Sequence, residues 1–314
     1  MNIIRRKNRV RIGIIHYQPI ELYPPIMNFL NYMSENNLPV HVFTTNKKGI
    51  EKFKRENIQI YRFSDLGKNK SRFINSIKYL YYNMSVILQL LICNCNKLMY
   101  YDPYSAFPAY IYTKYIKRSA KLLIHYHEYF TPQWFSNGMA LVKINHSLEQ
   151  KYLYRKASWI SHTNRDRIDL FLKDYYFIDP GVVYELPNFP PKSWIKQKTN
   201  NPNSENSSLR CVYIGSLGKN SYIKNFCSWV SNLNGRITLD VFSNNSTDEV
   251  KQFLKDLNNP YINFYEEWIG YYDLPEVLKN YEVGLILYNG ASLNRIYCAP
   301  NKLFEYLAFD LDVW

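Results

Sequence analysis

The sequence predicts an α/β protein of two successive domains, each built around a parallel, doubly wound sheet. Its 314 residues are enough for two separate hydrophobic cores. Short apolar runs alternate with segments of helical periodicity along the chain, without hairpin signals, and this alternation is typical of parallel sheets. A polar stretch at 196–208, rich in Asn and Ser, interrupts the alternation, which then starts again.

The first half of the chain predicts one complete domain. Apolar runs predict strands at 10–16, 39–44, 58–63, 97–102, 121–127 and 159–162. Helical spacing of apolar residues predicts helices at 24–34, 72–91, 105–117, 148–156 and 164–173. In the helix at 72–91, one face holds Phe73, Ile77, Leu80, Met84, Ile87 and Leu91. This amphipathic pattern is compatible with a core helix and with a helix that faces a membrane.

The second half repeats the same kind of alternation. It predicts strands at 210–214, 237–242, 262–265 and 283–288, and helices at 222–232, 248–257, 274–280 and from 302 onward. We therefore expect an N-terminal domain at 1–190, a linker at 191–208 and a C-terminal domain at 209–314.

Charge is distributed unevenly between the two halves. The chain has a formal net charge of +13; residues 1–190 hold 27 Lys and Arg against 13 Asp and Glu, and residues 191–314 hold 12 against 13. The N-terminal excess indicates an anionic partner, such as lipid headgroups, a phosphorylated acceptor or nucleic acid, or else a lysine-rich solvated surface.

The five cysteines have irregular spacing, so no disulfide framework is predicted and a reducing cytoplasm is the expected setting. The apolar run at 12–15 is too short for a signal peptide, and the run at 79–95 is too short and too polar to span a bilayer.

One ten-residue segment in the second half carries a specific resemblance. Residues 299–308 read Ala-Pro-Asn-Lys-Leu-Phe-Glu-Tyr-Leu-Ala and resemble the donor-site signature of GT-B glycosyltransferases, particularly of the family 4 type. The resemblance implies two Rossmann-like domains that face a cleft, with a nucleotide-sugar donor bound by the C-terminal domain. It implies that Glu305 accepts hydrogen bonds from two ribose hydroxyls, a task that suits a carboxylate. Asn301 and Lys302, at the helix entry, are then expected near the donor diphosphate.

A second segment supports this resemblance. Residues 212–217 resemble the first strand and glycine turn of the family's C-terminal domain, which places Gly215 and Ser216 near the donor phosphates. Many family members have Arg directly after the glycine and Lys several residues later. Here Ser216 replaces the Arg, and Lys219 or Lys224 is expected to provide the Lys. Residues 269–275 and 283–287 resemble the segment that holds the nucleotide base.

Two features depart from the family pattern. The fuller motif has a second glutamate eight positions before the first, and that position is Tyr297 here, which puts sugar recognition or catalysis in doubt. The chain also stops at Trp314, earlier than the pattern, so we expect the C-terminal domain to be incomplete. The string Asp310-Leu311-Asp312 matches the metal-binding D-x-D motif of other glycosyltransferases by chance, because it follows the donor helix.

The N-terminal domain offers a second set of candidates. His125-Tyr126-His127-Glu128 ends a predicted strand, and ligands of open α/β sheets bind at such carboxyl ends. The resemblance places a histidine near the donor sugar and acceptor, so His127 and Glu128 are the candidate catalytic pair. His125 is expected to be a buried, hydrogen-bonded histidine or, with His127, half of a metal site for which no third ligand is evident.

Arg165 and Arg167 begin the helix that follows the strand at 159–162. They are candidates to bind an acceptor phosphate, although a solvated helix face explains them as well. No G-x-G-x-x-G follows Gly13, so nicotinamide binding is not supported.

The resulting hypothesis is a glycosyltransferase that moves a sugar from a nucleoside-diphosphate sugar to a hydroxyl acceptor. It is expected to retain the anomeric configuration and to need neither a metal nor a cofactor, since amides and basic residues neutralise the leaving diphosphate. The expected acceptor is a glycan or lipid-linked glycan of envelope or capsular polysaccharide synthesis, at the cytoplasmic face of the membrane and its anionic surface. The alternative is a non-catalytic GT-B-like binding protein. A nucleic-acid partner is not supported, because the sequence contains no recognisable nucleic-acid-binding motif.

Overall fold

The computed structural model describes residues 10–65, 71–137, 140–196, 208–219 and 221–314 and divides the chain into two compact units. The first unit is Met1–Pro187 and the second is Asn188–Trp314. The boundary therefore lies three residues before the predicted end of the first domain. Most of the predicted linker, 197–207, lies outside the described residues.

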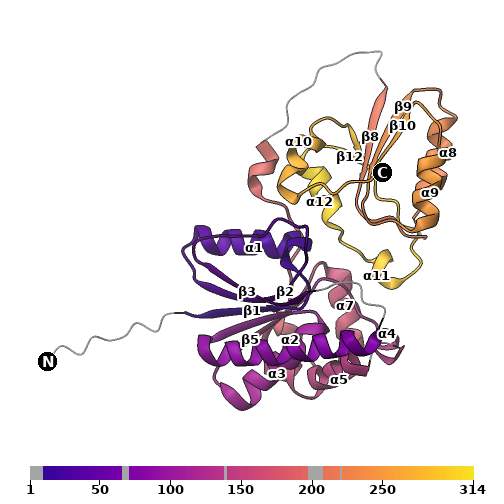
Figure 1. The fold of residues 1–314 in the computed structure, drawn as a ribbon. Helices are drawn as coiled ribbons and strands as arrows, with labels where there is room; N and C mark the ends of the chain where they lie inside the picture. Colours follow the sequence, from indigo (N-terminus) through magenta and orange to yellow (C-terminus); the bar gives the residue numbers. More distant parts are fainter. Residues whose placement is uncertain (1–9, 66–70, 138–139, 197–207, 220) are drawn as a thin grey trace. The chain divides into compact units, whose positions relative to one another are not determined.

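The first unit is a seven-stranded parallel sheet covered by helices on both faces (Figure 1). Its strands are β1 (Ile12–His16), β2 (Val40–Asn46), β3 (Ile58–Asp65), β4 (Lys97–Tyr101), β5 (Lys121–Tyr126), β6 (Ala157–His162) and β7 (Val183–Glu185). They pair in the order β3-β2-β1-β4-β5-β6-β7. The chain order reverses between β1 and β4, which makes the carboxyl ends of these two strands the expected place for a ligand.

Helices connect these strands and close the core of the first unit. They are α1 (Pro24–Glu35), α2 (Arg72–Cys93), α3 (Ala106–Ile111), α4 (Pro132–Asn137), α5 (Ala140–Leu148), α6 (Tyr154–Lys156) and α7 (Arg165–Asp174). Short 3-10 or π turns lie at Ile20–Leu22 (η1), Pro103–Ser105 (η2), Tyr112–Ile116 (η3), Glu149–Leu153 (η4) and Pro180–Val182 (η5). Figure 1 shows α1 on one face of the sheet and α2, α3 and α5 on the other. The predicted strands and helices of this half are present, and β7, α4 and α5 are additions.

The helix at 72–91 is present as α2, and the structure decides which of its faces is buried. The core side holds Tyr82, Val86 and Leu90, all fully buried, and the Tyr82 hydroxyl donates to the Phe43 carbonyl at 3.0 Å. The face that the sequence singled out is the exposed one, with only Ile87 of its members buried. No helix within the described ranges is long and apolar enough to cross a bilayer.

The second unit is a five-stranded parallel sheet of the same winding. Its strands are β8 (Leu209–Ile214), β9 (Ile237–Phe242), β10 (Ile262–Tyr265), β11 (Val283–Gly284) and β12 (Asp312–Val313), in the order β10-β9-β8-β11-β12. Its helices are α8 (Ile223–Ser231), α9 (Asp248–Asp256), α10 (Leu274–Leu278), α11 (Leu293–Ile296) and α12 (Asn301–Ala308), with short turns at Lys192–Lys196 (η6) and Tyr271–Asp273 (η7). The reversal of chain order here lies between β8 and β11.

Residues near the unit boundary belong to the second unit's own packing. Trp194, in η6, is 4% exposed, and its ring lies 4.9 Å from Tyr271 and 5.5 Å from Phe309. The segment before residue 197 is therefore packed against the second unit, although the sequence placed it in a linker. Asp312 opens β12 opposite Val283, the first residue of β11, so the Asp310-Leu311-Asp312 string lies at the amino edge of this sheet.

Candidate functional site

The candidate donor site lies at the reversal point of the second sheet. Gly215 follows β8 directly and has φ +135°, a backbone conformation that residues with a side chain rarely adopt. A Cβ atom at Gly215 would meet Lys302 Cε at 2.9 Å and Nζ at 3.0 Å. The missing side chain therefore lets the Lys302 ammonium lie against the backbone at the carboxyl end of β8.

Lys302, in the first turn of α12, is held by aromatic rings. Its Nζ lies 4.0 Å from the ring centroid of Tyr213, in β8, and 5.6 Å from that of Tyr288, beyond β11. Cation–π contacts of this kind fix the position of a charge without neutralising it. Burial lowers the pKa of Lys302 from its usual value.

Glu305 lies one turn further along α12 and is 8% exposed. Burial raises the pKa of Glu305 to about 7, and the nearby Lys302 charge acts in the opposite direction. Glu305 has no ion pair among the described residues, and a desolvated carboxylate of this kind is poised to accept hydrogen bonds from a ligand. Perturbed groups of this kind in α/β sheets are concentrated at functional sites.

The position of α12 is set by contacts on both of its sides. The Ile214 amide donates to the Tyr306 hydroxyl at 3.3 Å, and the Tyr306 ring occupies the space where a Cβ on Gly284 would lie. At the helix entry, Asn188 Nδ2 donates to the Ala299 carbonyl at 2.9 Å. No side chain of the described residues caps the first turn, which begins at Asn301. The Leu303 amide donates to the Pro300 carbonyl at 3.1 Å, so the amides of Asn301 and Lys302 are the ones that can meet an anion.

The structure brings some of the predicted donor residues together and leaves others apart. Gly215, Asn301, Lys302 and Glu305 gather at the reversal point, as described above. Ser216 lies in the same turn, but its hydroxyl accepts from Asn245 Nδ2 at 3.0 Å. Lys219 is exposed beyond this turn. Lys224, on α8, pairs with Glu249 of α9 at 2.7 Å, so it does not join the group.

Arg295 is a cation near this site that the sequence did not single out. It lies in α11, and its charge lowers the pKa of Tyr213 and of Tyr288, although burial raises both pKa values overall. Its Nη1 donates to Asn289 Oδ1 at 3.1 Å. The family pattern has an arginine where this chain has Ser216, and Arg295 brings a guanidinium to the same group of aromatic rings. Nothing in the local sequence marks it, because a loop far from Gly215 delivers it.

His127 lies one residue beyond β5, the strand next to the reversal point between β1 and β4 of the first unit. Its ring stacks on Tyr101 at 5.0 Å, and its amide donates to Asp102 Oδ1 at 3.0 Å. Burial lowers the pKa of His127 well below its usual value, so the ring is neutral near pH 7. Its buried Nε2 has no hydrogen-bond partner within the described parts of the chain.

The neighbours of His127 come from two other strand ends. His16 ends β1, and its ring lies 5.6 Å from that of His127. Asp102 follows β4 with φ +56° and ψ 160°, a strained conformation for a residue other than glycine. Burial raises the pKa of the Asp102 carboxyl well above its usual value. The ends of β1, β4 and β5 therefore bring His16, Asp102 and His127 together in one small polar cluster.

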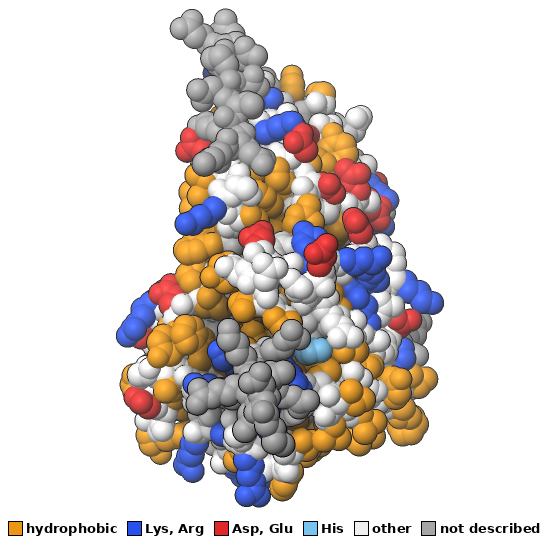
Figure 2. Space-filling model, turned by 90° about the vertical axis from the view of Figure 1, so that its left-hand side faces the viewer, with side chains coloured by type: hydrophobic (Ala, Val, Ile, Leu, Met, Phe, Trp, Pro, Cys, Tyr) orange, Lys and Arg blue, Asp and Glu red, His pale blue; other side chains and the backbone are white. Residues whose placement is uncertain are grey.

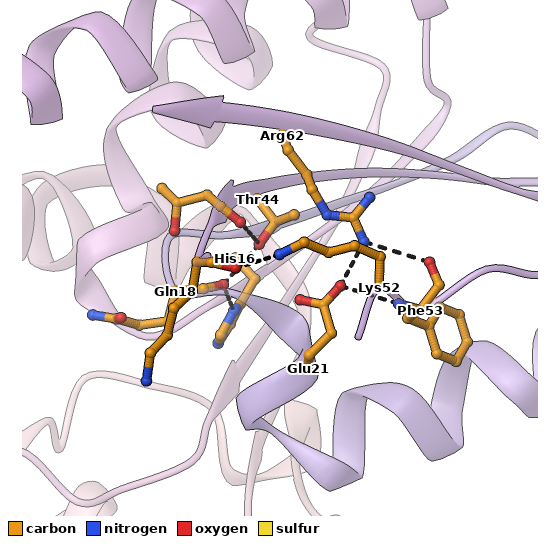
Figure 3. A network of polar contacts seen from close by, with 9 residues as sticks. His16, Gln18, Glu21, Thr44, Lys52, Phe53 and Arg62 are labelled. Carbon is orange, nitrogen blue, oxygen red and sulfur yellow. Dashed lines mark hydrogen bonds and ion pairs between the residues drawn. The ribbon is translucent and has the colours of Figure 1, made fainter. Parts of the chain in front are cut away.

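Hydrogen bonds join His16, at the end of β1, to the loop that follows the strand (Figure 3). The Gln18 carbonyl accepts from His16 Nδ1 at 2.5 Å and from Thr44 Oγ1 at 2.7 Å. Because the carbonyl can only accept, His16 Nδ1 carries the proton and Nε2 keeps its lone pair. Below this loop, the buried Glu21 carboxylate pairs with Arg62 at 2.5 Å.

The metal-binding potential of the first unit differs from the sequence expectation. The sequence left two roles open for His125, a buried hydrogen-bonded residue or a metal ligand together with His127. His125 is buried and its Nδ1 bonds Ser161 Oγ at 2.9 Å, which fits the first role. The ligand atoms of His16, Asp102 and His127 all lie within 4.8 Å of one another. Two imidazoles and a carboxylate are a donor set that a transition metal could accept, so these three residues are the place to look if a metal is found.

The remaining candidates of the first unit lie in different surroundings. Glu128 is exposed beside His127. Arg165 is exposed and pairs with Asp169 at 3.1 Å. Arg167 is only 4% exposed, and its Nη1 donates to the His127 carbonyl at 2.7 Å and to Thr163 Oγ1 at 2.8 Å. Its guanidinium therefore holds the His127 segment in place and is not presented to an acceptor phosphate.

Comparisons with solved structures cover almost the whole chain. The HepE protein of Anabaena, crystallised with UDP and glucose, matches with a TM-score of 0.66 at 10% sequence identity, over 97% of this chain and 80% of its own. Sucrose-phosphate synthase from Thermosynechococcus elongatus matches with a TM-score of 0.65 at 10% identity, over the same shares. The chain has the GT-B fold. The predicted fold class is thereby confirmed.

The GT-B fold does not by itself define a reaction. A putative UDP-N-acetylglucosamine 2-epimerase from Listeria monocytogenes is also similar, with a TM-score of 0.54 at 10% identity, over 88% of this chain and 74% of its own. No protein-family model matches the sequence, and no curated protein matches it either. Function must therefore be argued from the site residues.

Proposed function

We propose that this protein transfers a sugar from a nucleoside-diphosphate sugar to a hydroxyl acceptor, with the donor bound by the second unit. The observation that carries the proposal is the group formed by Gly215, Lys302 and Glu305 at the carboxyl edge of that sheet. At Gly215 no side chain prevents a ligand from approaching the backbone. Lys302 and Glu305, one helical turn apart on α12, provide a fixed positive charge and a buried carboxylate. Diphosphate and ribose need these features side by side.

Each member of the group has a distinct role in this proposal. Glu305, when ionised, accepts hydrogen bonds from the two ribose hydroxyls. The Lys302 ammonium and the uncapped amides of the α12 first turn, at Asn301, neutralise the diphosphate as it leaves. Arg295 adds a second positive charge there. Because these groups supply positive charge, we propose that transfer needs neither a metal ion nor a cofactor.

The first unit supplies the acceptor side in this proposal. His127 is buried and neutral, and its Nε2 is available to bond a sugar hydroxyl. Glu128, exposed beside it, can accept the proton or position the acceptor hydroxyl. We further propose that the anomeric configuration is retained and that the acceptor is a glycan or lipid-linked glycan of envelope polysaccharide synthesis, at the cytoplasmic face of the membrane.

A non-catalytic GT-B-like binding protein is the second candidate. Tyr297 stands where the family pattern has its second glutamate, and its phenol cannot replace a carboxylate at the donor sugar. A non-catalytic protein of this kind would bind a nucleotide sugar without releasing the free nucleotide.

Release of the free nucleotide, a diphosphate from UDP-, GDP- and ADP-sugars and CMP from CMP-sugars, separates the two candidates. The chain would be incubated with UDP-, GDP-, ADP- and CMP-linked sugars, with and without glycan acceptors, and with and without EDTA. The UDP and glucose in the Anabaena HepE structure make UDP-glucose the first donor to try. We expect acceptor-stimulated release with one donor class, unchanged by EDTA and lost in His127→Ala. Donor binding without any release would instead establish the non-catalytic protein.

A further inference from the structure

One helix of the first unit exposes an unusually continuous apolar face. The residues of this face, here called the α2 outer face, are Phe73, Ile74, Ile77, Leu80, Tyr81, Met84, Leu88, Leu91 and Ile92, each 40% to 74% exposed. They recur every three or four positions along the 22 residues of α2, so they form one stripe along the helix. Single exposed apolar residues are ordinary, but a contiguous stripe of this length marks an interaction surface.

The opposite side of α2 is apolar as well. Tyr82, Val86 and Leu90 are fully buried in the core of the first unit. The helix is therefore apolar on two sides, with Lys78, Ser85 and Gln89 along a strip between them, and the described residues cover only one of the apolar sides. Water against the outer face is unfavourable, and a helix of this kind is stabilised by an apolar partner.

The charge around the outer face restricts the nature of that partner. Residues 72–118 contain six Lys or Arg and a single acidic residue, Asp102, which lies beyond the carboxyl end of β4. Lys117 Nζ bonds the Asn94 carbonyl at 2.9 Å, at the carboxyl end of α2, and Arg118 is exposed beside it. Tyr115, 60% exposed, extends the apolar surface next to these cations.

We propose that the α2 outer face docks on an anionic lipid bilayer, with the helix lying in the plane of the headgroups. Its apolar side chains enter the acyl boundary, while Lys117 and Arg118 contact the anionic headgroups. A second copy of the chain fits less well: a two-fold interface would oppose two identical surfaces on which the segment 72–118 brings six cations and a single carboxylate. Figure 2 shows hydrophobic side chains exposed at the lower right of the view and Lys and Arg side chains at its lower edge.

Vesicle co-sedimentation of the full chain tests this proposal. The probes are vesicles of phosphatidylcholine with and without phosphatidylglycerol. We expect binding to the anionic vesicles that weakens as salt is added, because the headgroup attraction is screened. The double variant Leu80→Gln/Leu88→Gln keeps helix-forming residues and should lower vesicle binding about tenfold or more, since each apolar chain removed costs partition energy.

A matched control removes apolar surface elsewhere in the same unit. Tyr32 and Tyr176 are 59% and 89% exposed and lie outside α2, so Tyr32→Gln/Tyr176→Gln should bind vesicles like the unchanged chain. Far-ultraviolet circular dichroism checks that both variants are folded. Nucleotide binding by the second unit is measured separately, so failure of the donor proposal leaves this test intact.

Three outcomes overturn the inference. The first is no binding of the unchanged chain to anionic vesicles. The second is equal binding by the α2 variant and the control. The third is a dimer in solution that Leu80→Gln/Leu88→Gln converts to a monomer, which would assign the face to a second copy of the chain.

Discussion

Glu305 combines burial with a pKa of about 7, and this has a direct consequence for ligand binding. The ionised carboxylate is the form that accepts from two ribose hydroxyls, and it becomes the main form as pH rises through about 7. We therefore expect nucleotide-sugar affinity to increase by about tenfold in total between pH 6 and pH 8, with most of the increase below pH 7. Isothermal titration calorimetry at several pH values measures this directly.

The matching control for Glu305 is its amide. Glu305→Gln keeps the size of the side chain and cannot ionise, so its affinity should be lower and nearly independent of pH over the same interval. A variant that retains the full pH dependence would show that another group, such as the ligand phosphate, is responsible.

Lys302 and Lys224 form a second test at the level of single residues. Both were candidates for the donor phosphates, but only Lys302 lies against Gly215, while Lys224 pairs with Glu249 on the helix surface. Lys302→Gln should weaken nucleotide binding about 10- to 100-fold, the effect of losing a charged hydrogen bond. Lys224→Gln should leave binding unchanged within about twofold, since exposed ion pairs contribute little. Equal losses in both variants would contradict the site described here.

At the scale of secondary-structure elements, the turn after β8 depends on a missing side chain. Gly215 has φ +135°, and any Cβ there would meet Lys302 Cε at 2.9 Å. Gly215→Ala should therefore cost about 1–3 kcal/mol of unfolding free energy through backbone strain and displace Lys302 from the site. Chemical denaturation and nucleotide titration measure the two effects.

Gly218 provides the control for this turn. Three residues along the chain, it has no atom within 4 Å of a Cβ position and no positive φ, so Gly218→Ala should be close to neutral. Strong destabilisation by both substitutions, or by neither, would refute the role assigned to the Gly215 turn.

The elements also show what a single sequence can predict. The alternation of strands and helices was predictable because each buried strand and each helix leaves its own periodic signal. The three-residue β7 leaves too short a signal. For α2 the periodicity revealed an apolar face, but a helix that is apolar on both sides gives no signal for which side the core covers.

The candidate site divides in the same way. Asn301, Lys302 and Glu305 were predictable because they are close together in one segment, and Gly215 because it ends a strand. Arg295, His16 and Asp102 were not predictable, since separate loops bring them to their partners only in the folded chain. Arg167 is a residue type that often binds phosphate. Only the folded structure shows that its guanidinium is buried and bonds the His127 carbonyl instead.

At the scale of the whole molecule, several buried histidines make stability depend on pH. Burial lowers the pKa of His16 to about 4 and of His125 to about 3, and those of His127 and His162 well below their usual value. An unfolded histidine binds a proton below about pH 6.5, whereas these folded ones do not. Stability is thus fully present above pH 6.5 and is lost as pH falls toward 4, by up to about 1.4 kcal/mol per histidine and pH unit.

His162 is the histidine with which this dependence can be tested. Both of its ring nitrogens are buried without a partner in the described part of the chain, and its ring lies 4.7 Å from Phe171. His162→Phe should preserve the aromatic packing and lose less stability than the unchanged chain between pH 7.5 and pH 5. Thermal unfolding at the two pH values measures the difference, and an equal loss in both proteins would refute the explanation.

The most direct test of the account is whether the chain binds a nucleotide through the second unit. Thermal unfolding would be followed with UDP, GDP, ADP, CMP and their common sugars, for the unchanged chain and for Glu305→Ala. A ligand at 100 times its dissociation constant stabilises the folded state by about 2.7 kcal/mol, which is readily visible. We predict a shift with one nucleotide class that Glu305→Ala abolishes. The absence of a shift with every nucleotide, or a shift that Glu305→Ala leaves intact, would contradict the donor site proposed at Gly215, Lys302 and Glu305.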